Sequence, residues 1–322
     1  MDDQTLELLR TSLGHVLTSG EASSFLSQLD ELGWDDVVAD DDATAVRTLF
    51  EVKGESRSSA PALDVVLAAR LTSLVGDTSL RTAVLALGPD LLPAELAAAD
   101  GEQVVDIVTL APVDDSTRLY AAARAGDELR LTTFATSGLE RRPIGGLDPS
   151  LGLTRLVGTT TTSSIAVDAA LVLEELGALG RRALGAELCG LAEVMLRDAV
   201  AYAGDRRQYG RAIGSFQAVQ HRLADARAAL TGAAVVVAEA FADGSPWTAT
   251  AAKALAGRGF EEVSRQCQQT YGAIGFTFEH DFHRFLRRGY LLDACLGDWR
   301  SLQESIGREL ATTRTVPRIG SL

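Results

Sequence analysis

The chain has 322 residues, of which 46% are hydrophobic, so it exceeds the usual size of a single core and predicts two or three packed regions. Its formal net charge of −14 argues against a nucleic-acid partner, because proteins that bind a phosphate backbone carry basic patches. The cysteines, Cys189, Cys267 and Cys295, lack metal-ligand spacing. The first two lie in apolar helical stretches, which predicts buried free thiols.

The start of the chain shows no secretory signal. Its first residues are acidic and amphipathic, without a basic region followed by an apolar one. No run of residues reaches the length of about 18 apolar residues that a membrane span needs. We therefore predict a cytoplasmic protein without a membrane span.

The first third of the chain has helical periodicity. Apolar residues in 2–18 fall on one helical face, and further helices are expected over 23–32, 43–52 and 62–74. These segments predict a small helical domain over residues 1–77.

The next segment changes to short alternating runs bounded by glycine, proline and aspartate, which is typical of strands and turns. Strands are expected over 81–87, 104–112, 118–125 and 129–134. Together they predict a small β domain over residues 78–160. The run TTTTSS at 159–164 is interpreted as a linker into the third domain, residues 161–322.

The third domain has a helical pattern throughout, with one apolar stripe from Leu188 to Tyr202 and a second from Val219 to Phe241. Between them lies a turn rich in arginine and glycine. Arginine binds a diphosphate well because its planar fork donates two hydrogen bonds at once. Glycine lets the backbone approach a ligand closely. A plain helix–helix corner with solvated charges is the alternative interpretation.

The sequence of this turn, RRQYGRAIGSFQAVQHRLAD, resembles the C-terminal helical domain of the acyl-CoA dehydrogenase flavoproteins. The shared pattern R-x-x-[FY]-G-x-x-I-x-x-F-Q-x-x-x-H-x-L-A-D has many fixed positions in a short stretch, so it is specific. In that family the arginine, the aromatic residue and the glutamine reach across a subunit interface to the FAD of the neighbouring chain. The resemblance therefore implies cofactor-binding roles for Arg206, Tyr209 and Gln217.

A second segment, QTYGAIGF at 269–276, resembles the family pattern Q-x-x-G-G-x-G-[FY]. It implies that Gln269 and Gly272 contact the adenosine diphosphate end of FAD. Gly272 is also expected to end a helix, so a helix cap without a ligand is the alternative. Ala273 replaces the second glycine, and its methyl group disfavours a positive φ.

A further arginine and two histidines are weaker candidates. Arg181 matches an arginine in the family's substrate region, although a solvated pair with Arg182 is an equal alternative. In the segment FTFEHDFHRFLRR, Thr277 is expected to cap a helix whose first turn contains Glu279 and Asp281. His280 and His283 lie three residues apart without further ligands, so no metal site is predicted.

The chain departs from the family at its catalytic base. The family's reaction needs a carboxylate to remove the α-proton while FAD accepts the β-hydride. Most members carry this glutamate in a Tyr-Glu-Gly-Thr motif, where this chain has Leu296. A second group carries it where this chain has Gly180. We therefore predict no catalytic residue in this chain, and we expect the base from a partner.

The predicted β region also lacks the family's flavin-binding loop, T-E-P-x-x-G-S-D. The segment GFTFEHD followed by RFLRR, in residues 275–288, especially resembles actinobacterial acyl-CoA dehydrogenases of steroid side-chain breakdown, some of which are α2β2 heteromers. It implies an α+β fold with an N-terminal helical domain, a small β domain and a C-terminal four-helix bundle. It also implies the short subunit of an FAD-dependent acyl-CoA dehydrogenase with a longer partner subunit. The alternatives are a homotetramer using a displaced carboxylate (Glu279, Asp293 or Asp298) and a flavin-free assembly protein.

Overall fold

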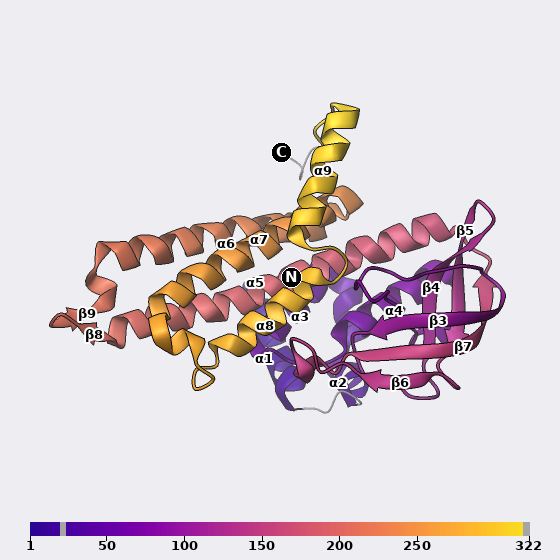
Figure 1. Ribbon diagram of the computed structural model, residues 1–322, viewed down its shortest axis with the longest axis horizontal. Coiled ribbons are helices and arrows are strands. Elements are labelled where there is room, and N and C mark those ends of the chain that lie inside the picture. The colour runs from indigo at the N-terminus through magenta and orange to yellow at the C-terminus, as the bar shows by residue number, and fades with distance from the viewer. Residues whose placement is uncertain (20–23, 318–322) are drawn as a thin grey trace.

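The structure is a computed structural model that describes residues 1–19 and 24–317. It shows the three predicted regions in the predicted order: N-terminal helices, a β-sheet, and long C-terminal helices (Figure 1). The sheet lies at one end of the molecule, and the long helices extend away from it to a narrow opposite end. One continuous hydrophobic core joins the N-terminal helices, the long helices and one side of the sheet.

The N-terminal region is helical, as predicted. Its helices are α1 (Asp3–Ser19), α2 (Phe25–Leu32), α3 (Trp34–Ser56) and α4 (Ala62–Val75). The predicted start of the second helix at residue 23 lies outside the described residues. Helix α3 is longer than predicted and kinks at Asp41, where φ is −156° and ψ is 82°. The acidic sequence before the kink has no apolar stripe, so periodicity revealed only the part after it.

The β region is mostly antiparallel, with strand order β1-β4-β5-β7-β3. Its strands are β1 (Val84–Leu85), β2 (Glu95–Leu96), β3 (Gly101–Thr109), β4 (Arg118–Ala125), β5 (Glu128–Ala135), β6 (Glu140–Pro143) and β7 (Thr154–Ile165). A short 3₁₀ helix, η2 (Thr78–Leu80), precedes β1, and another, η3 (Pro149–Leu151), precedes β7.

The predicted linker at 159–164 is wrong, because these residues belong to strand β7. That strand pairs with β3 from Gly101 opposite Thr162 to Thr109 opposite Thr154. Threonine is β-branched and fits a half-buried pleated surface. The alternate side chains Thr160 and Thr162 are buried, although their polar composition suggested a loop. The boundary predicted at residue 160 thus falls inside β7.

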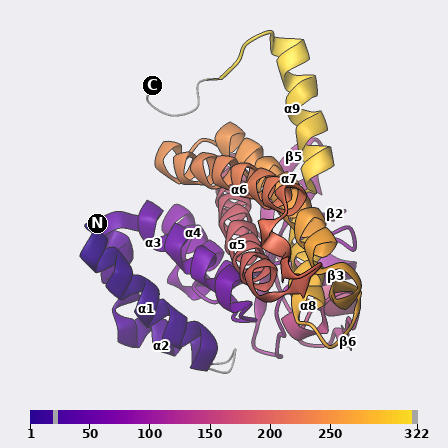
Figure 2. The ribbon, with the colours of Figure 1, turned by 90° about the vertical axis from the view of Figure 1, so that its left-hand side faces the viewer.

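The C-terminal region consists of long helices packed side by side. They are α5 (Ala169–Asp205), α6 (Gln217–Asp243), α7 (Pro246–Tyr271), α8 (Phe282–Ala294) and α9 (Trp299–Thr313). Helix α5 is central, because it packs against α3, α6, α7 and α8. Helix α9 instead leaves the body of the molecule and stands away from it in both ribbon views (Figures 1 and 2).

The prediction of buried free thiols is confirmed, since Cys189, Cys267 and Cys295 are buried and unbridged. Within residues 1–19 and 24–317, no helix is long and apolar enough to cross a membrane.

Candidate functional site

The predicted cofactor-binding turn forms a tight β-hairpin at the narrow end of the molecule. Helix α5 ends where Arg206 takes an extended backbone, and strands β8 (Arg207–Gln208) and β9 (Arg211–Ala212) follow. Tyr209 and Gly210 connect them with φ of 53° and 78°. Two positive φ values are the signature of a type I′ turn, which suits the twist of a hairpin. The turn directs Tyr209 outward, where it is 92% exposed.

The hairpin is held against the helices behind it. The backbone N–H of Ile213 donates to the carbonyl of Arg206 at 2.8 Å. Gly214 lies so close to α5 that a Cβ there would approach the carbonyl oxygen of Ala203 to 3.0 Å. The Arg211 guanidinium stacks on the ring of Phe216 at 4.0 Å. The exposed residues of the turn therefore project from a fixed base.

The second predicted segment lies at the same end of the molecule. Helix α7 ends at Gly272, as predicted, and there the backbone has φ 62° and ψ −135°, a conformation open almost only to glycine. The ring of Tyr271 packs on Tyr202 of α5, with centroids 5.1 Å apart. This contact joins the end of α7 to the end of α5. Ala273 follows in the 3₁₀ helix η5 (Gly272–Phe276) without a positive φ, so its methyl group causes no strain.

The end of the bundle thus brings together the five predicted cofactor-binding residues, and we call this surface the tip. It consists of Arg206, Tyr209, Gln217, Gln269 and Gly272. The side chains of the first four are exposed. In the described part of the chain, the polar groups of these four side chains make no hydrogen bond or ion pair within the protein. The neighbouring rings of Phe276 and Phe278 are 78% and 82% exposed.

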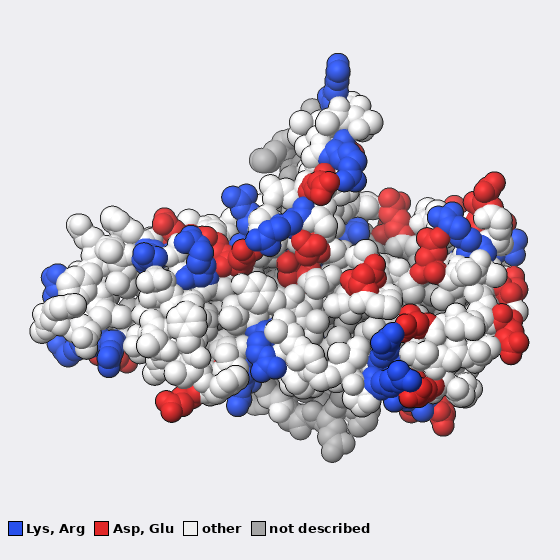
Figure 3. All heavy atoms as spheres, in the orientation of Figure 1, with Lys and Arg blue, Asp and Glu red and all other residues white. Residues whose placement is uncertain are grey.

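The composition of the tip indicates an interaction surface that another molecule covers. Exposed aromatic rings cluster there, and the cationic side chains over the β8–β9 hairpin are visible at the narrow end in Figure 3. Exposed aromatic residues together with arginines that lack an ion pair are typical of interaction sites.

Arg181 lies elsewhere, half-buried beside α7 and the turn after α8. Its Nε donates to the carbonyl of Leu296 at 3.2 Å and its Nη1 to Thr250 Oγ1 at 3.4 Å. Burial lowers the pKa of this guanidinium. Arg182 turns away to the carbonyl of Gly244 at 2.7 Å, so the two arginines do not form a solvated pair. The substrate role of Arg181 stays a prediction.

The two positions where the family keeps its base meet in space. Leu296 is 1% exposed, and its side chain covers Gly180 so closely that a Cβ there would lie 2.5 Å from Leu296 Cδ1. Leu67 of α4 lines the same spot. Neither position carries a proton acceptor on its side chain, and hydrocarbon fills the space that they share.

The nearby acids have structural partners or lie in solvent. Asp298 caps α9 by accepting from the N–H groups of Arg300 and Ser301, and these bonds outweigh partial burial and lower its pKa. Asp293 pairs with the buried Lys253 at 3.3 Å, and burial raises the pKa of its carboxyl. Glu279 is exposed.

The predicted cap of α8 is wrong. The helix begins at Phe282, so Glu279 and Asp281 precede it and are not in its first turn. Thr277 bonds back to the carbonyl of Ile274, not to α8. Asp281, at the N-cap position, makes no capping bond and instead pairs with Arg284 at 3.3 Å.

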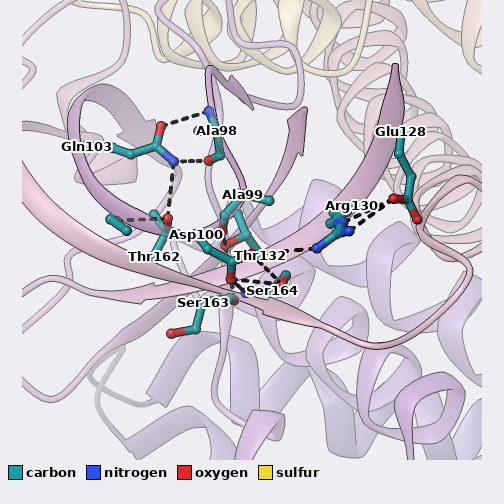
Figure 4. Close-up of polar contacts among 11 residues, drawn as sticks. Ala98, Ala99, Asp100, Gln103, Glu128, Arg130, Thr132, Thr162, Ser163 and Ser164 are labelled. Atoms are coloured by element: carbon teal, nitrogen blue, oxygen red, sulfur yellow. Dashed lines mark hydrogen bonds and ion pairs between the residues drawn. The ribbon is translucent and has the colours of Figure 1, made fainter. Parts of the chain in front are cut away.

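The β-region loop that stands in place of the family's flavin loop is bonded to its own sheet (Figure 4). The Gln103 side chain accepts from the Ala98 N–H at 3.1 Å and donates to the Ala98 carbonyl. Thr132 donates to the carbonyl of Ala99 at 2.8 Å. Because these groups satisfy one another, the Ala98 N–H and the Gln103 amide are not free to bind a flavin ring.

The interior between α3, α4 and α5 is closed. Lys53 Nζ bonds Glu187 Oε1 at 2.6 Å, and Asp64 lines the same small cavity as these two residues. That cavity has a volume of about 20 Å³, which is room for about one water molecule. An acyl chain does not fit there without rearrangement of the core.

Asp64 makes the stability of the fold depend on pH. Burial raises the pKa of its carboxyl to about 7, although the charge of Lys53 opposes the shift. The native state therefore holds this proton more tightly than the unfolded chain does, whose carboxyl titrates near pH 3.8. The stabilising contribution of this group to the free energy of unfolding is present below about pH 4 and is lost as the pH rises to about 7.

We expect Asp64→Asn to be more stable than the natural chain at about pH 8.5, by on the order of 1–2 kcal/mol, because the penalty of a buried charge exceeds that of a buried amide. The advantage should disappear near pH 5. Urea unfolding at both pH values measures it, with Asp127→Asn in the exposed β4–β5 turn as the control. An advantage that is equal at both pH values would contradict the role of Asp64.

Comparison with known proteins identifies the family to which this chain is similar. The model of the family described as acyl-CoA dehydrogenase, C-terminal domain, matches residues 171–310. The acyl-CoA dehydrogenase IpdE2 of Mycolicibacterium smegmatis is 30% identical over 224 residues, which cover 68% of this chain and 67% of that protein. IpdE2 of Mycobacterium tuberculosis is 33% identical over 181 residues, covering 55% of this chain and 52% of that protein, so the match spans about half of its length.

Two solved structures share the whole fold. The ChsE4–ChsE5 complex from Mycobacterium tuberculosis gives a TM-score of 0.81 at 21% identity, covering 99% of each chain. The Tcur3481–Tcur3483 steroid ACAD gives 0.79 at 20% identity, covering 97% of this chain and 99% of that one. The chain has the acyl-CoA dehydrogenase fold. Together with the sequence matches, this shows that the chain belongs to the acyl-CoA dehydrogenase family.

Proposed function

We propose that this chain is the short subunit of a heteromeric acyl-CoA dehydrogenase and lends its tip to FAD bound mainly by a longer partner subunit. One observation carries the proposal. The tip presents a set of unpaired donors and rings, whereas the chain's own base positions are filled by Leu296 packed on Gly180. A chain that offers FAD-binding residues to a neighbour and has no carboxylate at its own base positions needs a second subunit for catalysis.

The residues of the tip suit FAD chemically. Arg206 offers a free planar fork for the diphosphate, and Gln217 and Gln269 offer amide donors and acceptors. The backbone at Gly272 has no Cβ to obstruct a ligand. When it is bound, FAD supplies hydride acceptance in the α,β-dehydrogenation of an acyl-CoA thioester. This chain's residues bind and orient the cofactor, and the partner holds the carboxylate that takes the proton.

The names of the structural neighbours support the finer parts of the proposal. One neighbour is a complex of two differently named chains and the other is titled a steroid ACAD. We therefore propose an α2β2 assembly that acts on a steroid side-chain CoA ester. We assign Arg181 to the substrate region. Its bond to the Leu296 carbonyl holds it beside the positions where the family keeps its base.

The first test compares the chain alone with the chain co-expressed with a longer acyl-CoA dehydrogenase-like subunit. Alone, it is expected to purify without a flavin spectrum, because no chain supplies the other half of the site. With the partner, we expect bound FAD and turnover of acyl-CoA. A stable homotetramer with one FAD per chain would overturn the heteromer. A flavin-free complex with the partner would favour an assembly role.

The second test concerns the catalytic base. We expect Glu279→Gln, Asp293→Asn and Asp298→Asn in the assembled complex to keep turnover within about tenfold, since loss of a general base typically costs ~10²–10⁴ in rate. Dye reduction by acyl-CoA measures turnover, and flavin absorbance and unfolding midpoints serve as controls. A collapse in turnover with flavin and assembly intact, from any one variant, would place the base in this chain.

A further inference from the structure

A cluster of arginines lies along α8, the helix that runs between the tip and the sheet in Figure 1. Arg284, Arg287 and Arg288 are three and four residues apart, so they lie on one side of this helix. Arg57, the residue that follows α3, packs on the same helix, with its Cζ 5.0 Å from the centre of the Phe285 ring. We call these four arginines the α8 arginine cluster. It shares no residue with the tip.

The α8 arginine cluster carries more positive charge than its acidic partners balance. Arg288 is buried and pairs with Asp148, and the exposed Arg284 pairs with Asp281 at 3.3 Å. Within residues 1–19 and 24–317, the other two arginines of the cluster form no ion pair. Four guanidinium groups thus face two carboxylates, which leaves an excess of two positive charges. This excess is unusual on a chain whose formal net charge is −14.

Arg57 is the arginine of the cluster whose polar groups are least satisfied. Its Nη1 is buried and has no hydrogen-bond partner. In the part of the chain that the structure describes, its side chain forms neither a hydrogen bond nor an ion pair. Burial lowers the pKa of this guanidinium, and the nearby charge of Arg284 lowers it further. A buried N–H group is normally paired, so Arg57 points to an acceptor that the chain itself does not supply.

We propose that the α8 arginine cluster binds a phosphate group between the guanidinium groups of Arg57 and Arg284. A guanidinium donates to two phosphate oxygens at once, which suits it to this ligand. A phosphate group carries a charge of about −1.5 to −2 near neutral pH, which matches the excess of the cluster, whereas a single carboxylate would leave part of it unbalanced.

The surface beside the cluster also suits the organic part of a phosphate ester. Arg287 Nε donates to the carbonyl of Leu147, whose side chain is 45% exposed. An apolar group therefore lies next to the cationic ones. The phosphate has two possible sources, inorganic phosphate and a phosphate ester, and they share the chemistry that the arginines recognise.

The test is isothermal titration calorimetry of the full chain with inorganic phosphate at low ionic strength. The Arg206→Ala background is used, so that phosphate bound at the tip does not contribute. We expect one phosphate per chain, and we expect Arg57→Met to weaken binding at least about tenfold. Arg57→Lys should restore it only in part, because a point charge cannot make a bidentate contact. The matched control is Arg308→Met, which removes an exposed arginine paired with Glu304 on α9 and should leave the affinity unchanged.

Urea unfolding distinguishes an arginine that binds a ligand from one that supports the fold. Without phosphate, Arg57→Met should unfold at the same or a higher urea concentration than the natural chain. Methionine can still pack on Phe285, and the substitution removes an unpaired charge beside Arg284. Phosphate should raise the unfolding midpoint of the natural chain and leave that of Arg57→Met unchanged.

Adenosine monophosphate identifies the source of the phosphate. Binding at least about tenfold tighter than that of inorganic phosphate would identify an ester, and equal or weaker binding would identify free phosphate. Equal phosphate affinity in the natural chain and Arg57→Met would overturn the proposal. So would the loss of phosphate binding in the complex with a longer subunit, which would assign the cluster to the contact between subunits. None of these measurements depends on flavin, so their failure is distinguishable from failure of the proposed function.

Discussion

Replacing Arg206 with alanine is expected to weaken FAD binding by the assembled complex roughly tenfold to hundredfold. A charge-assisted hydrogen bond to a phosphate is worth about 1.5–3 kcal/mol, which corresponds to that change in affinity. In the described structure Arg206 makes no competing ion pair, so its loss should leave the unfolding midpoint of the chain nearly unchanged. Titration of the apo-complex with FAD, followed by flavin fluorescence, measures the affinity.

Two further variants distinguish a bidentate contact of Arg206 from a nonspecific effect of positive charge at the tip. Arg206→Lys should rescue poorly, because a point charge cannot make a bidentate contact. Arg207→Ala, the control, removes the adjacent exposed cation on β8 and is expected to have a small effect. If FAD binds the Arg206→Ala complex as tightly as the natural one, Arg206 is only a surface charge.

Replacing Arg288 with methionine is expected to destabilise the chain by about 3–5 kcal/mol, because it leaves a buried carboxylate without its partner. The Arg288 side chain is fully buried and bonds Asp148 of the β region. It also donates to the carbonyl of Ser58 after α3 at 2.8 Å and to Ser150 Oγ at 3.0 Å. One guanidinium on α8 therefore joins all three regions of the fold.

Urea unfolding monitored by circular dichroism measures this loss. The control is Arg284→Met on the same helix, whose ion pair with Asp281 is exposed and should be worth no more than about 1 kcal/mol. The double variant Arg288→Met with Asp148→Asn should recover part of the stability, because the unpaired charge is gone. Equal losses for Arg288→Met and Arg284→Met would show that burial of the ion pair has no energetic role.

The long helices and the tip could be predicted from the sequence because their signals are local. The stripe ending at Tyr202, the glycines of the turn and the helix stop at Gly272 each lie within a few residues of the structure that they specify. The cofactor roles at the tip came from a family pattern, and they stay predictions until flavin binding is measured.

The features that the sequence did not reveal depend on contacts between residues that are distant in the chain. Strand β7 is polar in composition and becomes a strand because β3 and β5 pair with it. The closure of Leu296 over Gly180 joins the turn between α8 and α9 to helix α5, and neither residue type signals the other. The projection of α9 is likewise invisible, because an amphipathic stripe indicates an apolar face and does not show what covers it.

The contact between Leu296 and Gly180 also makes a carboxylate base hard to introduce at either position by a single substitution. Leu296→Glu would put a carboxylate against Leu67 and Gly180 in a packed apolar site, where an unpaired charge costs several kcal/mol. Gly180→Glu would drive a side chain into Leu296, whose Cδ1 would lie 2.5 Å from the new Cβ. Gly180→Glu is thus blocked by Leu296 itself, whereas Leu296→Glu is disfavoured by the apolar side chains around it. Under the proposed division of labour with a partner subunit, a base at position 180 would therefore need a change at Leu296 as well, and a single mutation there would not supply it.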